Sequence, residues 1–318
     1  MKNMEEIYDV AVIGGGPAGV AAAIYTSRKQ LKTIFLTDTI GGQSVGSSGI
    51  ENWIGVESLS GIELAKALEK HLRAQENINI QTSQRVSKLE STQNGVTIET
   101  EKGDTIKAQT AIITTGGRHR HLGVPGEEEF SGKGVVFCAT CDAPFFRDKT
   151  VAVVGGGNSG LEAVVDLFPF AKKIYLIVLG DTLKGDPITQ EEVKASEKVE
   201  IIYGANTTKI LGEKMVTGLE YEEIPSDEKI KKTLDVDGVF VQIGSVPNTE
   251  FAKNLVETND FGEIVINHKS GETSQPGVFA AGDATDTPYK QNNIAAGDAV
   301  KAALSAYDYV LKKRREQK

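Results

Sequence analysis

Two glycine-rich turns, each directly after a short apolar run, constrain the fold of this chain more than any other feature. The first spans 14–19 and follows the apolar run 8–13, and the second spans 155–160 and follows the run 150–154. Both fit the spacing G-x-G-x-x-G, and each is followed by helix-forming sequence and another apolar run. In a strand–turn–helix unit of this kind, the three glycines permit the tight turn, the approach to a pyrophosphate and close helix packing. The sequence therefore predicts an α/β fold with two Rossmann-like nucleotide-binding domains of the three-layer ββα type.

The first turn carries the fuller set of signals for a bound dinucleotide. Asp38 follows the apolar run 33–36, about 20 residues beyond Gly19, where a carboxylate accepts hydrogen bonds from an adenosine ribose. The helix that begins after Gly16 offers unpaired N–H groups and a positive dipole end to phosphates. The alternative is a glycine turn without a ligand. The strand before it, the helix after it and the acid at the right distance favour the bound dinucleotide.

The second turn predicts another nucleotide site but leaves its specificity open. The strand after it ends at 177–180 as Ile-Val-Leu-Gly, so the nearest carboxylate to the ribose position is Asp181. Lys184 is the nearest cation, and no arginine pair is present to hold a 2′-phosphate. NADH and NADPH both stay possible donors, and a relic nucleotide fold with little affinity is the alternative.

The chain has two cysteines, Cys138 and Cys141, and they form one C-x-x-C just before the second turn. Two thiols at this spacing can close a small disulfide ring, and C-x-x-C motifs lower the pKa of one thiol. Asp142 follows directly and can carry the proton that a thiolate gains or loses. A structural zinc site needs four ligands, and the spacing of His119 and His121 is not that of a metal pair. Two buried cysteines without chemistry are the remaining alternative.

Composition excludes several classes of partner. The chain has 318 residues, a formal net charge of -9 and a pI near 5.2, so its surface repels nucleic acid and anionic lipid. No run of 18 apolar residues and no secretory signal is present, which predicts a cytoplasmic protein without a membrane span. The charged residues 312–318 are expected to fray.

The order of the segments indicates that the second nucleotide domain is inserted into the first. Strand-like and helix-like segments continue after the second unit, and the chain ends in an Ala-rich helical segment at 294–311. We place the crossings near 116–118 and 244–248. The first predicted dinucleotide-binding domain comprises 1–117 and 248–318. The predicted NAD(P)-binding-like domain comprises 118–247 and carries the C-x-x-C.

With these motifs in hand, the chain resembles the low-molecular-weight thioredoxin reductase family. In pattern it is closest to the flavoprotein subunit of alkyl hydroperoxide reductase without the N-terminal domains of that subunit. The resemblance covers 9–311, and its blocks together are specific. These blocks are 14–28, 41–43, 50–52, 138–142 with Pro144, 155–166, 282–283 and 288–291.

The resemblance implies FAD as cofactor and a role for each matching residue. Cys141 would face the flavin, Cys138 would attack the disulfide of the partner, and Asp142 would be the acid and base. Gly155, Gly157, Asn158, Ser159 and Glu162 would belong to the nicotinamide site of the NAD(P)-binding-like domain, 118–247. The FAD site would lie in the FAD-binding domain, 1–117 and 248–318, and would be formed by Gly14, Gly16, Pro17, Ala18, Gly19, Asp38, Gly42, Gln43, Asn52, Gly116, Gly282, Asp283, Lys290 and Gln291.

The expected function is that of a thioredoxin-disulfide reductase, with electrons passing from NAD(P)H through FAD to the cysteine pair. The dithiol would reduce a thioredoxin- or glutaredoxin-like protein. The resemblance also implies a homodimer and a domain rotation about hinges near Gly117 and Gly244. The chain departs from the family at Val178, where the peroxide-reductase subunits carry Glu and the thioredoxin reductases begin a His-Arg-Arg run. A ferredoxin-type donor and a flavin-bound redox sensor therefore remain alternatives.

Overall fold

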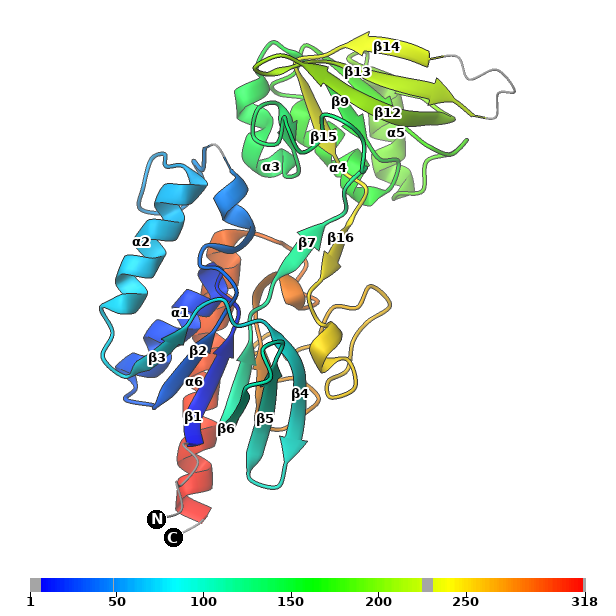
Figure 1. Ribbon diagram of the computed structural model, residues 1–318. Helices are drawn as coiled ribbons and strands as arrows, with labels where there is room; N and C mark the ends of the chain where they lie inside the picture. Colours follow the sequence, from blue (N-terminus) through cyan, green and yellow to red (C-terminus); the bar gives the residue numbers. More distant parts are fainter. Residues whose placement is uncertain (1–6, 48, 225–230, 317–318) are drawn as a thin grey trace. The chain divides into compact units, whose positions relative to one another are not determined.

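The computed structural model describes residues 7–47, 49–224 and 231–316, and the chain divides into two compact units (Figure 1). The first unit consists of Met1–Ser47, Trp53–Arg118 and Val246–Lys318, and the second of Ser48–Asn52 and His119–Ser245. The main body of the second unit is thus one segment inserted into the first. This confirms the expectation of an α/β fold with one Rossmann-like domain inserted into another.

The first unit is built on a seven-stranded sheet with a parallel core. Strand β1 pairs in parallel with β2 and β6, β3 extends the sheet beyond β2, and β17 pairs with the end of β6. An antiparallel hairpin, β4–β5, continues from the other part of β6. The strands are β1 (Ile7–Ile13), β2 (Thr33–Leu36), β3 (Ile78–Gln81), β4 (Val86–Thr92), β5 (Gly95–Thr100), β6 (Thr105–Ile113) and β17 (Val278–Ala280).

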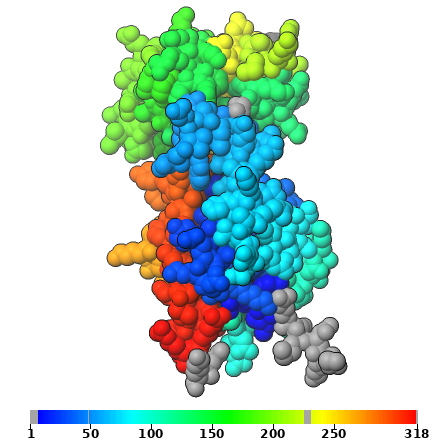
Figure 2. Space-filling model, turned by 90° about the vertical axis from the view of Figure 1, so that its left-hand side faces the viewer, coloured from blue at the N-terminus to red at the C-terminus, as the bar shows by residue number. Residues whose placement is uncertain are grey.

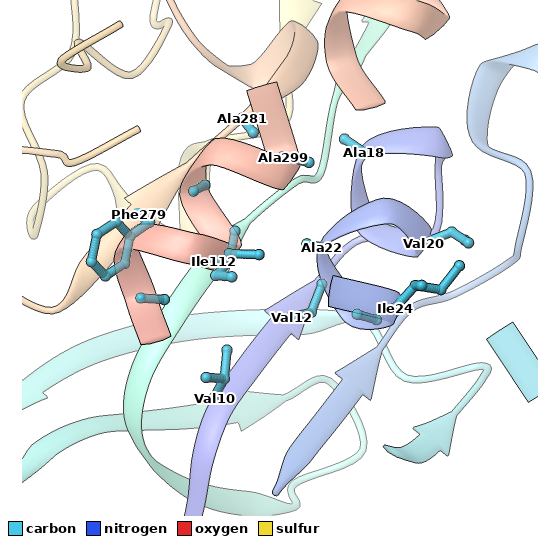
Figure 3. Close-up of a cluster of buried hydrophobic side chains, with 14 of the residues drawn as sticks. Val10, Val12, Ala18, Val20, Ala22, Ile24, Ile112, Phe279, Ala281 and Ala299 are labelled. Carbon is cyan, nitrogen blue, oxygen red and sulfur yellow. The ribbon is translucent and has the colours of Figure 1, made fainter. Parts of the chain in front are cut away.

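Side chains of the helices pack on one face of the parallel strands, and side chains of the β4–β5 hairpin and of 252–266 pack on the other. The helices and short helical turns are α1 (Pro17–Arg28), η1 (Gly42–Gly46), α2 (Gly61–Arg73), η3 (Glu250–Ala252), η4 (Gly282–Ala284) and α6 (Asn292–Glu316). Alternate residues of β1 enter different cores. Val10 and Val12 pack with Ala22 of α1 and Ala299 of α6, as Figure 3 shows, whereas Ile13 packs with the hairpin side. Both faces are buried, as is typical of a parallel sheet.

Helix α2 lies at the surface of the first unit, where it is coloured cyan in Figure 2. Ser60 caps its N-terminus in a capping box with Glu63, in which each side chain bonds to the backbone N–H of the other residue. Only Gly61, Leu64 and Leu72 of this helix are buried. No helix within the described part of the chain combines the length and apolar character needed to span a bilayer.

The expectation of a frayed tail after residue 311 is wrong within the described residues, because α6 continues to Glu316. Arg314 donates to the buried carboxylate of Asp9 at 2.7 Å, which fastens the last turn of α6 to the start of β1. Basic side chains in this turn also interact favourably with the negative end of the helix dipole.

The second unit repeats the plan on a smaller scale. A parallel sheet has the order β11-β10-β9-β15-β8, with α3, α4 and α5 contributing to the core on one face. The antiparallel sheet β12-β13-β14 packs on the other. Its elements are β8 (Val135–Val136), α3 (Ala139–Asp142), η2 (Ala143–Phe146), β9 (Thr150–Val154), α4 (Asn158–Leu167), β10 (Lys173–Ile177), α5 (Pro187–Ala195), β11 (Val199–Ile202), β12 (Ala205–Gly212), β13 (Val216–Glu223), β14 (Lys231–Asp235) and β15 (Gly238–Val241). The chain crossings form the short strand pair β7 (Gly117–His119) and β16 (Ser245–Pro247).

Candidate active site

The first glycine turn is shaped by close backbone approaches that allow no side chain. Gly14 has φ of +121°, and a Cβ built there would lie 2.2 Å from the carbonyl oxygen of Thr114. A Cβ on Gly19 would lie 1.9 Å from the carbonyl oxygen of Gly14. Gly16 is different, since a Cβ there would meet only the Cα of Gly42, at 4.0 Å. The first and third glycines therefore hold helix against strand, while the second keeps the backbone accessible.

Helix α1 presents its N-terminus at this turn without a side-chain cap. Gly16 is the N-cap residue and makes no side-chain hydrogen bond, and Pro17 occupies the first helical position. The first-turn N–H groups of a 12-residue helix carry a positive partial charge and suit a phosphate.

A cavity of about 950 Å³ opens over this turn, entirely within the first unit. The predicted site residues that line it come from β1, α1, the end of β2, η1, the end of β6 and η4. They are Gly14, Gly16, Pro17, Ala18, Asp38, Gly42, Gln43, Gly116 and Asp283. Burial raises the pKa of the Asp283 carboxyl, and the charge of Lys290 opposes this rise. A cavity of this size, with a bare helix N-terminus, an acid after β2 and open backbone at Gly16, fits an extended dinucleotide such as FAD.

Other predicted residues lie outside the cavity lining. Gly19 and Gly282 are buried. Lys290 donates to the carbonyl of Thr285 at 2.5 Å and pairs with Glu263 at 2.9 Å. Gln291 is partly buried at the residue before α6. Asn52 groups with the second unit, where its Nδ2 lies 3.8 Å from Cys141 Sγ.

Several residues of the cavity wall are not predicted from the sequence. Ser44 Oγ donates to Asn292 Oδ1 at 3.0 Å, which joins η1 to the start of α6. Only one feature of the sequence indicates Asn292 as a site residue: it directly follows the predicted site residue Gln291. The cavity wall also contains polar residues outside the sequence motifs. Examples are Arg85, Thr115, Arg118, Asn248 and Glu250.

The second glycine turn reproduces the backbone geometry of the first. Gly155 has φ of +136°, and a Cβ there would lie 2.1 Å from the carbonyl oxygen of Gln242. A Cβ on Gly160 would lie 1.9 Å from the carbonyl oxygen of Gly155, the same distance as for Gly19. Gly157 caps α4 without a side-chain bond and has open space around it. The two turns thus agree down to individual backbone contacts, which indicates an internal duplication of the fold.

An apolar side chain packs against this second turn. Val178 is buried, and its Cγ1 would lie 2.7 Å from a Cβ on Gly156. The loop after it folds back, since the N–H of Lys184 donates to Gly156 O and the N–H of Asp186 donates to Asn158 Oδ1. Ser159 and Glu162 are exposed on α4. Val178 can accept no hydrogen bond from a ribose.

The two cysteines form a disulfide, with their Cα atoms 5.3 Å apart, at the start of α3. Both are partly buried. The short helix is tied to α4 by a hydrogen bond of 2.7 Å from Thr140 Oγ1 to Asp166 Oδ2. No group of three or more His, Cys, Asp and Glu among the described residues could hold a metal ion.

Asp142 lies in the same turn, and the pKa of its carboxyl is strongly raised. Burial raises the pKa of its carboxyl from 3.8 to about 6, against the lowering effect of a backbone hydrogen bond from Cys138. A carboxyl that titrates near neutral pH next to a cysteine pair is suited to proton transfer.

The pKa of Asp142 leads to a stability prediction for the oxidised protein. Between about pH 4 and pH 6 the folded protein binds more protons at this site than the unfolded chain, so the free energy of unfolding should fall as pH rises. A shift of this size corresponds to a loss of up to about 3 kcal/mol. Asp142→Asn should remove this slope and stabilise the protein at pH 7. Denaturant unfolding of both proteins from pH 4 to pH 7 measures it, and equal slopes would contradict the assignment.

The fold and these sites define a class: a two-domain dinucleotide-binding protein with a redox-capable disulfide in the inserted domain. The chain matches the model of the pyridine nucleotide-disulphide oxidoreductase family over residues 8–302. It therefore belongs to this family, and it is an FAD-dependent oxidoreductase of the family.

Two groups of relatives stand out among the similar proteins. The chain is 45% identical to the F subunit of alkyl hydroperoxide reductase of Pseudomonas aeruginosa over 311 residues, which cover 96% of this chain and 59% of the relative. It is 43% identical to the same protein of Staphylococcus epidermidis, with 98% and 60% covered. The chain thus spans about three-fifths of these curated relatives. The thioredoxin reductase structure from Streptococcus pyogenes is 34% identical, with a TM-score of 0.90 and coverage of 96% of this chain and 99% of that one.

Proposed function

We propose that this chain is a thioredoxin reductase-like enzyme that reduces a disulfide in a small thioredoxin- or glutaredoxin-like protein. Electrons from NAD(P)H would reach the Cys138–Cys141 disulfide by way of FAD. FAD, when bound, supplies the chemistry that accepts an electron pair from one partner and releases it to another. With two electrons and two protons, the disulfide becomes two thiols. The dithiol then forms a disulfide again as the disulfide of the partner protein is reduced.

This proposal depends on one observation. The Cys138–Cys141 disulfide and the Asp142 carboxyl, whose pKa is raised, lie on the same turn of a Rossmann-like domain. In the proposed roles, Cys138 attacks the partner disulfide and Cys141 completes the exchange. Asp142 supplies or removes the proton of a thiol. The names of the relatives support the disulfide chemistry, but they do not agree on the protein that accepts the electrons. One group comprises thioredoxin reductases, and the other comprises alkyl hydroperoxide reductase subunits.

The proposed FAD site is the cavity of the first unit, in a domain of residues 1–117 and 248–318 with Arg118 at its boundary. Gly14, Gly16 and the N-terminus of α1 would hold the pyrophosphate, and Asp38 would accept hydrogen bonds from the adenosine ribose. The polar wall around Gln43 and Asp283 would hold the rest of the cofactor. Gly155, Gly157, Asn158, Ser159 and Glu162 would form the nicotinamide dinucleotide site in a domain of residues 118–247.

The donor is proposed to be NADH rather than NADPH. Lys184 is the nearest cation for a 2′-phosphate, and its backbone N–H already fixes the loop on Gly156. Because the buried Val178 provides no acceptor for a ribose hydroxyl, affinity for NADH should be modest. We propose a homodimer on the strength of the family resemblance, and a cytoplasmic location as the sequence analysis predicts.

An anaerobic titration of the flavin absorbance tests this proposal. NADH should bleach the flavin absorbance at lower concentration than NADPH, and a thioredoxin disulfide should then restore the absorbance. If reduced ferredoxin bleaches the flavin and neither nicotinamide does, a protein donor replaces NAD(P)H; Val178 is the observation that favours this second candidate. If the flavin is reduced but no disulfide protein reoxidises it repeatedly, the chain is a redox sensor and the proposal fails.

A further inference from the structure

Two ion pairs border one end of the cavity in the first unit. Each joins an arginine to a glutamate, and all four side chains are more than half exposed. Ion pairs with this exposure contribute little to stability, so stability does not account for their position in the cavity wall. The four residues are Arg85, Glu101, Arg118 and Glu250.

This end of the cavity is the one that contains Asp38. The N–H of Ser83 donates to the carbonyl of Asp38 at 2.9 Å, and the N–H of Gln84 donates to that of Thr37 at 2.9 Å. These bonds fix the segment that leads into Arg85 against the end of β2. The charged residues therefore lie at the end where Asp38 would hold the adenosine ribose.

Arg118 is held there at both of its terminal nitrogens. Nη1 donates to Asn248 Oδ1 at 2.6 Å, and Nη2 donates to Glu250 Oε1 at 2.7 Å. Burial alone would raise the pKa of Glu250, but the hydrogen bond from Arg118 and the nearby charge of Arg85 lower it, so the carboxylate stays ionised. With both nitrogens bonded, the plane of the guanidinium is fixed.

The residue that orients Arg118 is itself fixed. The backbone N–H of Asn248 donates to Gly116 O at 2.9 Å, and its side-chain Nδ2 donates to Thr115 O at 2.9 Å. Thr115 Oγ1 donates back to Asn248 O at 2.6 Å. The segments around 115–116 and 248, far apart in the sequence, are thus hydrogen-bonded to each other and together orient the guanidinium of Arg118.

We propose that Arg118 positions the adenine of FAD by offering the flat face of its guanidinium to the base. This inference rests on the FAD site of the proposed function and adds a specificity-determining residue to it. A guanidinium stacks well on an aromatic ring, and Asn248 and Glu250 set its plane before the cofactor arrives. The preformed orientation lowers the cost of ordering on binding.

Titration calorimetry of the apoprotein with FAD, ADP and FMN tests this, since ADP lacks the flavin and FMN lacks the adenine. Arg118→Met keeps most of the aliphatic stem but removes the guanidinium. It should raise the Kd for FAD and for ADP about five- to tenfold and leave the Kd for FMN unchanged. The matched control is Arg73→Met, which removes an exposed arginine bonded at 2.7 Å to Glu69 on α2, outside the cavity lining. This control should change none of the three constants.

The outcomes separate this inference from the proposed function. A wild-type apoprotein that takes up no FAD would refute the FAD site itself. If the wild type binds FAD but Arg118→Met leaves the FAD and ADP constants unchanged, or weakens FMN equally, the adenine role is refuted. Should Arg118→Met fold poorly, Arg118→Lys keeps the charge without the planar fork. It should show the same loss for FAD and ADP, and wild-type constants for Arg118→Lys would refute the role.

Discussion

Cys138→Ser should reduce the turnover of a thioredoxin disulfide by about a thousandfold or more while leaving flavin uptake unchanged. The sulfur that attacks the partner disulfide is lost, and a serine hydroxyl cannot form the mixed disulfide. Flavin binding should persist because the cavity lies wholly within the first unit, whereas Cys138 lies in the second. Steady-state reduction of a thioredoxin and the flavin-to-protein ratio of the purified variant measure the two effects.

Two further variants make this result specific. Cys141→Ser should abolish turnover as well, and only Cys141→Ser should still trap a partner protein through Cys138 as a stable mixed disulfide. Thr140→Val is the matched control, since it changes a residue between the cysteines and removes only the hydrogen bond to Asp166. It should retain most of the activity. A Cys138→Ser protein with wild-type turnover would refute the proposed chemistry.

The two nucleotide turns can be predicted from the sequence because glycine spacing encodes backbone geometry directly. Gly19 and Gly160 are needed where a helix passes within contact of the preceding strand, and this local requirement is readable without the rest of the chain. Element ends are harder to place. Strand β6 ends at Ile113, and Gly116 adopts a φ of +64° before β7 begins.

The residues that the sequence does not reveal depend on contacts between distant segments. Arg118 becomes part of the cavity wall only because Asn248 and Glu250, more than 100 positions later, are brought beside it. Likewise, Arg314 extends α6 because it reaches Asp9 at the other end of the chain. No local sequence pattern predicts such pairs, because each of these residues taken alone is a charged residue like many others on a protein surface.

The internal duplication provides the second large expected effect, through a matched pair of substitutions. Gly19→Ala should weaken FAD binding by about a hundredfold, which corresponds to ~3 kcal/mol of overpacking. A Cβ at this position would lie 1.9 Å from Gly14 O, so α1 must move away from β1 and its N-terminus leaves the phosphate position. Gly160→Ala creates the same 1.9 Å contact with Gly155 O in the second unit. It should retain FAD at wild-type stoichiometry and lose reduction by a nicotinamide donor.

Because the added Cβ makes an equally short contact in both variants, a difference between them in FAD binding or in reduction by the donor shows which nucleotide each turn holds. Gly297→Ala serves as the control, since a Cβ at that position of α6 meets nothing within 4 Å. It should bind FAD and react with the donor like the wild type. Equilibrium dialysis of FAD and anaerobic reduction by NADH measure the two properties for all three variants. If Gly160→Ala loses FAD as fully as Gly19→Ala does, the assignment of one cofactor to each turn is wrong. If Gly160→Ala is reduced by NADH at the wild-type rate, the second turn does not hold the donor, and an electron-transfer protein must take its place.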